Sequence, residues 1–571
     1  MWIGTVEFVA AAALVTVVAA APPTQKHEWK ANHGAVASEL KECSEAGGSM
    51  IKAGGNAVDA AIATALCVGT IGMHHSGIGG GGFALIRTPT GNYTFLDFRE
   101  TAPGAAFEEM FVNKTDKPSL YSGQASGVPG ELRGLETMHK RFGQLPWRAL
   151  FKPSIHYAKN GFLVNPDLAK TFAGLEFLHN DPAWARDFAP KGTLVKEGET
   201  MYRKRYAETL EKIARHGAKV FYSGEMADST VRTLKARDGI MTLEDLQKYE
   251  VAEREPLSIT YRGYKIWGTS APSSGAVALS ALKIYEGFEV TGNKVLDTHR
   301  LIEATKFAYG QRTKFGDPSF VQGLWQFQRD TLSEPVIKEL RSKILDDRIL
   351  GNSSFYEPDG LESIDTPGTA HIATTDSTGF SVSMTTTINT WFGSRIMDPF
   401  TGIIFNSQMD DFSVPGSSNY FGYLPSPSNF ILPGKRPLSS ITPLILESPS
   451  SPHSLSPLSP STSAPYLIIG SAGGSRITTA TLQTVHHIVD NSMTLLQALS
   501  QGRWHNQLNP EVTSFEWRYG NDTVGGLKKR GHRVEWTGEG GSSVQGVRVL
   551  GEGKWEAVGE VRQRASGGMI V

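Results

Sequence analysis

The sequence predicts an α+β protein, because helical and β-patterned segments occupy different parts of its 571 residues. Residues 127–345 carry mostly helical patterns. The chain after residue 370 instead holds short β-patterned runs, at 371–375, 380–388, 402–406, 441–446, 466–470 and 545–549. Helical runs followed by runs of strands are typical of an α+β fold or of separate domains, and the length allows several domains or one large unit.

The overall composition is that of an ordinary globular protein. Hydrophobic residues make up 40% of the chain, enough for a sizeable core, and the formal net charge is −1. Such a neutral balance gives no support for binding to nucleic acid or to a charged membrane surface.

The N-terminus differs from the rest. Residues 8–21 are apolar except for Thr16 and precede two prolines. A bilayer-spanning helix needs about 20 apolar residues, so we expect a signal peptide over residues 1–21, removed near Ala21. The segment contains Glu7 and no Lys or Arg, which leaves a membrane anchor as the alternative. Either reading places the chain in the secretory pathway.

Two further features agree with secretion. The sequence contains four glycosylation sequons, at Asn92, Asn113, Asn352 and Asn521. It also contains only two cysteines, Cys43 and Cys67. In an oxidising compartment these cysteines could form a disulfide, and the residues alone leave open that they are two unrelated buried thiols.

Residues 36–70 predict two helices. The first is expected to break at Gly47-Gly48, and the second begins after Asn56, a good N-cap with Asp59 three residues later. The second helix has a face of alanines, which allows close packing against a sheet.

The glycine run that follows, Gly79–Gly82, permits positive φ and close approach of backbone. No Gly-Lys-Ser/Thr follows it, so it is not a phosphate loop. A strand at 83–87 follows directly, which is not the setting of a dinucleotide fingerprint. The adjacent His74-His75 pair has no second cluster of ligands, and we expect no metal.

The central region is expected to form a scaffold without chemistry. Helices are predicted over 129–142, 207–216, 242–249 and 297–309, with Thr242 as an N-cap. A strand pair is predicted at 257–261 and 264–269. Later in the chain, Ser or Pro fills thirteen of the eighteen positions 448–465, which predicts a disordered surface loop between two neighbouring buried strands.

Thr369 is the candidate nucleophile. It stands at the head of a predicted hairpin, directly after Gly368. A threonine hydroxyl is weak alone, but cleavage before it would free an α-amine with a pKa of ~8 that can act as its base. Taken by itself, a threonine after such a turn is more often an ordinary strand residue, so the other motifs must decide its role. Arg99, just past a strand at 93–98, is placed to bind a carboxylate in bidentate fashion, with a surface salt bridge to Glu100 as the alternative.

Seven segments together resemble the γ-glutamyltransferases (γ-glutamyl transpeptidases), which are N-terminal-nucleophile hydrolases. In chain order they are 53–61, 77–81, 98–103, 368–371, 406–412, 437–440 and 470–474. They follow the family's order, and the resemblance extends from about residue 34 to near the C-terminus.

The resemblance implies a four-layer αββα fold and a proenzyme that cuts itself between Gly368 and Thr369. The products would be a large subunit, 22–368, and a small catalytic subunit, 369–571, which stay together. In the precursor, Thr369 Oγ would attack the Gly368 carbonyl. In the mature enzyme it would attack a γ-glutamyl amide, and the acyl group would pass to water, an amino acid or a dipeptide.

The resemblance also assigns roles to individual residues. Thr387 would orient the nucleophile, and the amides of Gly473 and Gly474 would form an oxyanion hole. The donor's carboxylate would be bound by Arg99, Ser439 and Ser440, and its ammonium by Asp411, Asn389 and Gln408. The family varies between Glu and Gln at position 408, so ammonium binding here would depend more on Asp411. The resemblance also implies that Cys43 and Cys67 are paired, because they match a disulfide found in some eukaryotic members of the family.

The function expected from this resemblance is that of a secreted, vacuolar or membrane-anchored extracellular γ-glutamyltransferase and glutathione hydrolase. It needs no cofactor or metal, and its substrates are glutathione and related γ-glutamyl compounds. Two alternatives remain: an amidase or acylase of the same fold that only hydrolyses, and a homologue that binds without being processed. The Arg99 and Asp411 pair argues against the first, and intact Thr369 argues against the second.

Overall fold

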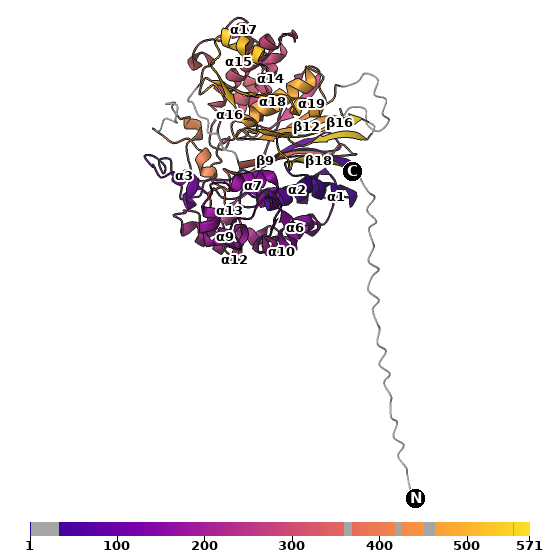
Figure 1. Ribbon diagram of the computed structural model, residues 1–571, viewed down its shortest axis with the longest axis vertical. Coiled ribbons are helices and arrows are strands. Elements are labelled where there is room, and N and C mark those ends of the chain that lie inside the picture. Colours follow the sequence, from indigo (N-terminus) through magenta and orange to yellow (C-terminus); the bar gives the residue numbers. More distant parts are fainter. Residues whose placement is uncertain (2–32, 359–367, 417–424, 450–462, 552) are drawn as a thin grey trace.

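The computed structural model describes the whole chain except residues 2–32, 359–367, 417–424, 450–462 and 552. Two β-sheets lie face to face, and helices cover the outer face of each, as Figure 1 shows. This arrangement confirms the predicted α+β class and the four-layer αββα architecture. Almost all of the predicted signal segment and most of the Ser/Pro-rich interruption lie outside the described residues.

The first sheet holds the candidate nucleophile near its centre. Its seven strands follow the order β18-β1-β9-β10-β2-β3-β6, and every neighbouring pair is antiparallel. The strands are β1 Gly34–Ser38, β2 Gly81–Arg87, β3 Tyr93–Asp97, β6 Ala252–Arg254, β9 Gly368–Asp376, β10 Ser381–Asn389 and β18 Gly567–Ile570.

The second sheet has six strands in the order β17-β16-β12-β11-β8-β7. They are β7 Leu257–Tyr261, β8 Tyr264–Gly268, β11 Leu444–Glu447, β12 Pro465–Ala472, β16 Ser543–Gly551 and β17 Lys554–Val558. β11 and β12 are neighbours, as predicted for the strands on either side of the Ser/Pro-rich segment. The sheets pack through apolar side chains, among them Phe83 and Leu85 from the first sheet and Ile445 and Ile468 from the second. Shorter strands are β4 Phe162–Leu163, β5 Thr200–Met201, β13 Trp504–His505, β14 Thr513–Glu516 and β15 Val534–Thr537.

One helical layer covers the first sheet and the other covers the second (Figure 1). The first is built mainly from α1 Lys41–Lys52, α2 Ala57–Ile71, α4 Glu131–Phe142, α5 Trp147–Leu150, α6 Lys152–Asn160, α7 Pro166–Phe172, α8 Phe177–Asn180, α9 Pro182–Phe188, α10 Lys204–His216, α11 Lys219–Tyr222, α12 Glu225–Lys235 and α13 Leu243–Lys248. The second is built from α14 Gly275–Glu286, α15 Lys294–Arg312, α16 Leu324–Thr331, α17 Glu334–Lys343, α18 Arg476–Val489, α19 Leu495–Leu499 and α20 Asn521–Lys529. α3 Pro118–Tyr121 lies at one side. Over the described ranges, no helix combines the length and apolar character needed to cross a bilayer.

The two predicted N-caps are confirmed, whereas the helical pattern expected from residue 36 begins only at Lys41, because Gly34–Ser38 form strand β1. Asn56 and Thr242 each form a capping box, with Asp59 and Asp245 respectively three residues later. In such a box the cap side chain accepts from a free amide of the first turn and the acidic side chain accepts from the cap amide, so both orphan donors are satisfied.

The predicted break at Gly47-Gly48 is wrong, because α1 runs through both residues. A Cβ on Gly47 would lie 2.2 Å from Thr64 Oγ1 of α2. Glycine is therefore needed here for the close approach of two helices, and this packing outweighs its poor intrinsic helix propensity. The same pair of helices is joined by the Cys43–Cys67 disulfide, which the structure contains.

The glycine run Gly79–Gly82 does allow close backbone approach, as predicted. A Cβ on Gly80 would lie 2.0 Å from the carbonyl oxygen of Thr387 on β10. Positive φ occurs at Gly77, at the start of the same glycine-rich segment, with a φ of +153°, and at none of Gly79–Gly82. The predicted strand over 402–406 is also wrong, since the segment forms only an isolated bridge between Met397 and Ile404. Asn406 instead hydrogen-bonds Gly79, which fastens the segment to the glycine run.

Both sheets combine strands from before and after Gly368. In the first sheet β9 lies between β1 and β10, and β10 in turn pairs with β2. In the second sheet β11 pairs with both β8 and β12. The two parts of the chain are thus interleaved within each sheet, and they share one core.

Candidate active site

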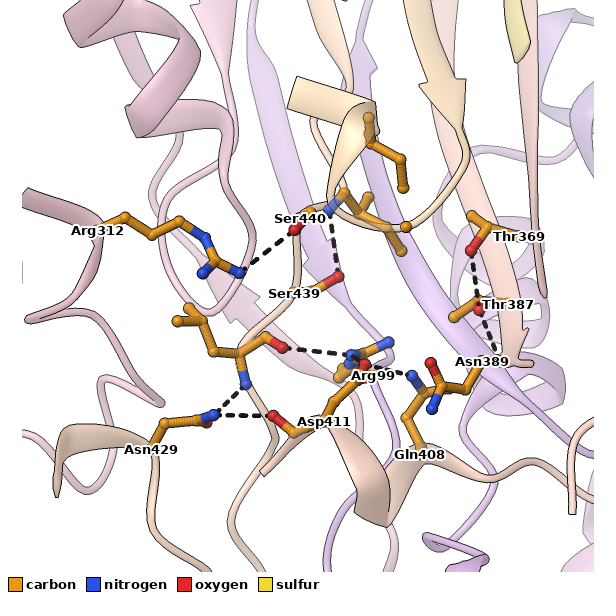
Figure 2. A pocket seen from close by; sticks show the side chains of 14 residues that line it. Arg99, Arg312, Thr369, Thr387, Asn389, Gln408, Asp411, Asn429, Ser439 and Ser440 are labelled. Atoms are coloured by element: carbon orange, nitrogen blue, oxygen red, sulfur yellow. Dashed lines mark hydrogen bonds and ion pairs between the residues drawn. The ribbon is translucent and has the colours of Figure 1, made fainter. Parts of the chain in front are cut away.

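Thr369 is the second residue of β9 and stands directly opposite Thr387 of β10. The two hydroxyl oxygens are 3.2 Å apart, and a dashed line joins them in Figure 2. Thr387 donates its own hydroxyl proton to the carbonyl oxygen of Gly368 at 2.6 Å. The remaining hydrogen bond between the two threonines therefore runs from Thr369 to Thr387. The amide of Asn389 also donates to Thr387 Oγ1, at 2.8 Å, which holds the acceptor in place.

A cavity opens beside Thr369 and gathers most of the predicted site residues. Fourteen residues line it (Figure 2). Nine of them were predicted: Arg99, Thr369, Thr387, Asn389, Gln408, Asp411, Ser439, Ser440 and Gly474. Gly473 does not line this cavity and lies in a second one, which Thr369 also borders. The structure thus brings together residues that are more than 370 positions apart in the chain.

Arg99 and Asp411 form an ion pair in the lining of this cavity, with Arg99 buried and Asp411 partly exposed. Arg99 is only 1% exposed, and its Nη2 donates to Asp411 Oδ2. Gln408 Nε2 donates to the same carboxylate oxygen at 2.7 Å. The alternative reading of Arg99, a surface salt bridge with Glu100, is wrong: both side chains are buried and their closest N···O distance is 4.0 Å. Burial raises the pKa of Asp411, and the neighbouring Arg99 acts in the opposite direction.

Two buried amide oxygens near this pair have no hydrogen-bond partner within the described residues. They are Asn389 Oδ1 and Gln408 Oε1. An unmet acceptor in a protein interior costs roughly 1–3 kcal/mol. Together with the Asp411 carboxylate they form a set of acceptors suited to an ammonium group, because an ammonium offers three donors.

Arg312 and Asn429 belong to the cavity and were not predicted. Arg312 Nη2 donates to Ser440 Oγ at 3.3 Å, and Figure 2 shows the guanidinium reaching that serine from α15. One side chain of the central region, which was predicted to be a scaffold, therefore lines the candidate site. Asn429 bonds the carbonyl of Asp411 and the amide of Leu438, so it ties the Asp411 turn to the serine segment. Arg312 is the last residue of α15, and the helical pattern of that segment gave no signal of its position at the site.

Gly473 and Gly474 join β12 to α18, with φ of +122° and +59°. Their amides form no hydrogen bond to any other residue in the described part of the chain, so both are available as donors. A Cβ on Gly473 would lie 2.4 Å from the carbonyl oxygen of Gly541, which explains why only glycine fits. Two free, adjacent amides next to a nucleophile are the usual composition of an oxyanion hole.

Glu100 lies behind Arg99, fully buried, and neither of its carboxylate oxygens has a hydrogen-bond partner among the described residues. Burial raises the pKa of Glu100 to about 8, with Arg99 opposing the shift. The residue is therefore mostly protonated at neutral pH, and Asp411 remains the carboxylate that faces Arg99.

A threonine at the head of a central strand, inside two stacked sheets covered by helices, gives this chain the fold of the N-terminal-nucleophile hydrolases. More specifically, the sequence matches the family described as Gamma-glutamyltranspeptidase over residues 43–570. The chain belongs to the γ-glutamyltranspeptidase family.

Individual relatives agree with this membership. The chain is 47% identical to a glutathione hydrolase proenzyme of Arthroderma benhamiae, over 96% of this chain and 94% of the relative. Among solved structures, a cephalosporin acylase from Bacillus halodurans aligns with a TM-score of 0.78 and 28% identity, over 98% of this chain and 99% of that one. A γ-glutamyltranspeptidase from Helicobacter pylori aligns with a TM-score of 0.53 and 32% identity, over 56% of this chain and 93% of that one.

Proposed function

We propose that this protein is a self-cleaving γ-glutamyltransferase and glutathione hydrolase with Thr369 as its nucleophile. The observation that carries the proposal is that Thr369 contacts Thr387 and borders a cavity lined by the ion pair of the Arg99 guanidinium and the Asp411 carboxylate. An amino-acid head group carries the complementary pair of charges, an α-carboxylate and an α-ammonium.

The uncut chain is arranged for self-cleavage. Thr369 Oγ attacks the Gly368 carbonyl carbon, and its proton moves toward Thr387, which already accepts from it. The hydrogen bond from Thr387 to the Gly368 oxygen polarises the carbonyl under attack. The C–N bond of Gly368–Thr369 breaks, the nitrogen takes up the proton, and water hydrolyses the resulting ester. The products are a carboxylate on Gly368 and a free amine on Thr369.

The fragments 22–368 and 369–571 would remain together as a heterodimer. The support for this is that strands from both parts alternate in each sheet, so separation would break up both sheets and expose their shared core. The free-energy cost of exposing that much buried apolar surface to water opposes separation of the fragments.

In the mature enzyme the free amine of Thr369 takes the proton from its own hydroxyl, and the oxygen attacks the γ-carbonyl of the donor. The negative charge that develops on that carbonyl oxygen is stabilised by the amides of Gly473 and Gly474, at roughly 3–4 kcal/mol per donor. The amide bond breaks, the leaving amine receives the proton, and a γ-glutamyl ester remains on Thr369. Water or an acceptor amine then releases the acyl group.

The donor's head group would bind between Arg99 and Asp411. Arg99, with Ser439 and Ser440, would take the carboxylate, and Asp411 would take the ammonium with the free acceptors of Asn389 and Gln408. The unfilled space in this cavity is only about 40 Å³. Binding of the head group therefore breaks the direct ion pair between Arg99 and Asp411. Arg99 then pairs with the carboxylate of the donor, and Asp411 pairs with its ammonium.

The decisive experiment is product analysis with glutathione, with and without a dipeptide acceptor. We expect glutamate from glutathione alone and a γ-glutamyl dipeptide product when the acceptor is present. A denaturing gel of the same preparation should show two fragments, with threonine at the new N-terminus. Release of glutamate with no transfer product at high acceptor concentration would support the amidase alternative, and an active preparation with one intact chain would contradict the mechanism.

The secretory pathway is the proposed location. The support is the apolar N-terminal segment, the Cys43–Cys67 disulfide, and the exposure of all four sequon asparagines, Asn92, Asn113, Asn352 and Asn521. Disulfides persist in oxidising compartments, and glycans attach to exposed asparagines.

A further inference from the structure

Arg312 lies at the end of α15, against the serines that would bind the carboxylate of the donor. It is 9% exposed, and it lines the same cavity as Arg99 and Asp411. Its Nη2 donates to Ser440 Oγ at 3.3 Å, and its Nε donates to Ser274 Oγ at 3.1 Å. The guanidinium therefore holds two hydroxyl groups at once, and one of them faces the cavity.

Ser274 connects this guanidinium to the other serine of the pair. Its hydroxyl donates to the carbonyl oxygen of Ser439 at 2.6 Å, so the bond from Arg312 is the one that it accepts. Ser274 is also the N-cap of α14, and its amide donates to the carbonyl oxygen of Ile441 at 2.8 Å. Arg312 thus fixes the side chain of Ser440 directly, and it fixes the backbone of Ser439 through Ser274.

The partners of the two serine hydroxyls determine where their protons point. A guanidinium has N–H donors and no acceptor, so Ser440 Oγ must accept from Arg312. The amide of Ile441 likewise donates to Ser439 Oγ, at 3.2 Å. Within the described ranges neither serine hydroxyl donates to another group of the protein. Each therefore keeps its proton for a group that enters the cavity, which both serines line (Figure 2).

Hydroxyls that are held as donors distinguish a carboxylate from a carboxamide. A carboxylate offers acceptors alone, whereas the NH2 of a carboxamide offers two donors. A donor placed against a hydroxyl proton leaves both without a hydrogen bond, which costs binding free energy. If Ser440 were released from Arg312, its hydroxyl could rotate and accept from the NH2, and the distinction would weaken.

We propose that Arg312 is a positioning residue for the α-carboxylate of the donor. It directs the proton of Ser440 into the cavity and holds Ser439 through Ser274, and it thereby makes the site selective for a free α-carboxylate over an α-carboxamide. The proposal rests on the function proposed above and adds the source of this selectivity. Arg99 supplies the charge that pairs with the carboxylate, and Arg312 sets the direction of the neighbouring hydroxyls.

The test compares two competitive inhibitors, glutamate and isoglutamine, which differ only in carrying a carboxylate or a carboxamide on the α-carbon. Their Ki values are measured against the donor γ-glutamyl-p-nitroanilide. Arg312→Lys keeps the charge and loses the forked guanidinium. In this variant we expect the ratio of the Ki for isoglutamine to the Ki for glutamate to fall about threefold to tenfold. Arg300→Lys, on the same helix and paired with Asp346, is the matched control and should keep the ratio.

Two readouts separate positioning from a general loss of structure. The kcat for the anilide should stay within about twofold, because the contact with the carboxylate is the same before and during attack. Self-cleavage requires no donor, so Arg312→Lys should be cut at the original rate on denaturing gels. Ser274→Ala removes the link to Ser439 and should lower the Ki ratio about twofold to threefold.

An unchanged Ki ratio in a cut Arg312→Lys protein, or an equal rise of both Ki values, would overturn the role of Arg312. If Arg312→Lys is not cut, the ratio in Ser274→Ala decides, and an unchanged value there would overturn the proposal. Absence of anilide turnover by the unaltered protein would instead contradict the proposed function, so the two failures can be told apart.

Discussion

The hydroxyl of Thr387 donates to the carbonyl oxygen of Gly368 at 2.6 Å, while its oxygen lies 3.2 Å from Thr369 Oγ1. One side chain thus contacts both the attacking oxygen and the carbonyl that it would attack. The register of β9 and β10 sets this contact. Thr387 pairs directly with Thr369, and a bulge between Thr387 and Asn389 then places Asn389 opposite Gly368.

Thr387→Val should slow self-cleavage by roughly 10²- to 10³-fold, the loss seen when one donor to a developing oxyanion is removed. Thr387→Ser keeps the hydroxyl and should cut at close to the original rate. The measurement is the fraction of intact chain on denaturing gels over time. Equal rates for the valine and serine variants would show that the hydrogen bond to Gly368 has no part in cleavage.

Thr369→Ala should abolish both self-cleavage and turnover, because the variant has no oxygen to attack either carbonyl. Thr369→Ser is the matched control, and it should still be cut and remain active. The gel and the assay with glutathione are run on the same preparations. If the alanine variant still released glutamate, Thr369 would not be the nucleophile.

Arg99→Ala should chiefly raise the KM for γ-glutamyl donors, by about 10- to 100-fold, as expected for the loss of a charged hydrogen bond to the substrate carboxylate. Steady-state kinetics separate this from an effect on kcat. Arg141→Ala removes an arginine from an exposed ion pair with Glu253 and serves as the control. An unaltered KM in Arg99→Ala would contradict the assigned role.

Glu100→Gln should change how stability depends on pH. The folded protein holds a proton on Glu100 up to a pKa of about 8, whereas the ordinary glutamate value is 4.5. Between these values folding takes up a proton, so stability falls as pH rises and levels off above about pH 8. The variant should lose this contribution, which amounts to at most about 1.4 kcal/mol per pH unit. Unfolding free energies measured from pH 5 to 8 test this, and identical slopes would contradict it.

Replacing both Cys43 and Cys67 by alanine should lower the unfolding free energy by about 3 kcal/mol, the chain-entropy value for a loop of this length. The sequence separation of the two cysteines is 24. Denaturant titrations with and without reductant provide the measurement. Reductant should destabilise the unaltered protein and leave the double variant unaffected; a protein indifferent to reductant would argue against a formed disulfide.

Two helix caps and several of the strands could be read from the sequence, because those signals are local. Asn56 and Thr242 cap their helices as predicted, since a capping box involves only residues three positions apart. The predictions that failed were those in which tertiary contacts outweigh local preference. Gly47 stays helical where α2 packs closely against it, and Gly48 where Met569 and Val571 do. Asn406, at the end of the segment 402–406, bonds to the glycine run in place of a strand partner.

The sequence by itself predicted the α+β class, and the resemblance of its short motifs to a known family implied the αββα architecture and most of the residues of the candidate site, since short motifs carry the chemistry of single side chains. Only the tertiary structure decided how those side chains meet. It pairs Arg99 with Asp411, extends Arg312 from α15 to Ser440, and places Thr369 between two cavities. The physical reason is that these contacts join distant segments through strand register and sheet packing, and neither is encoded within a single motif.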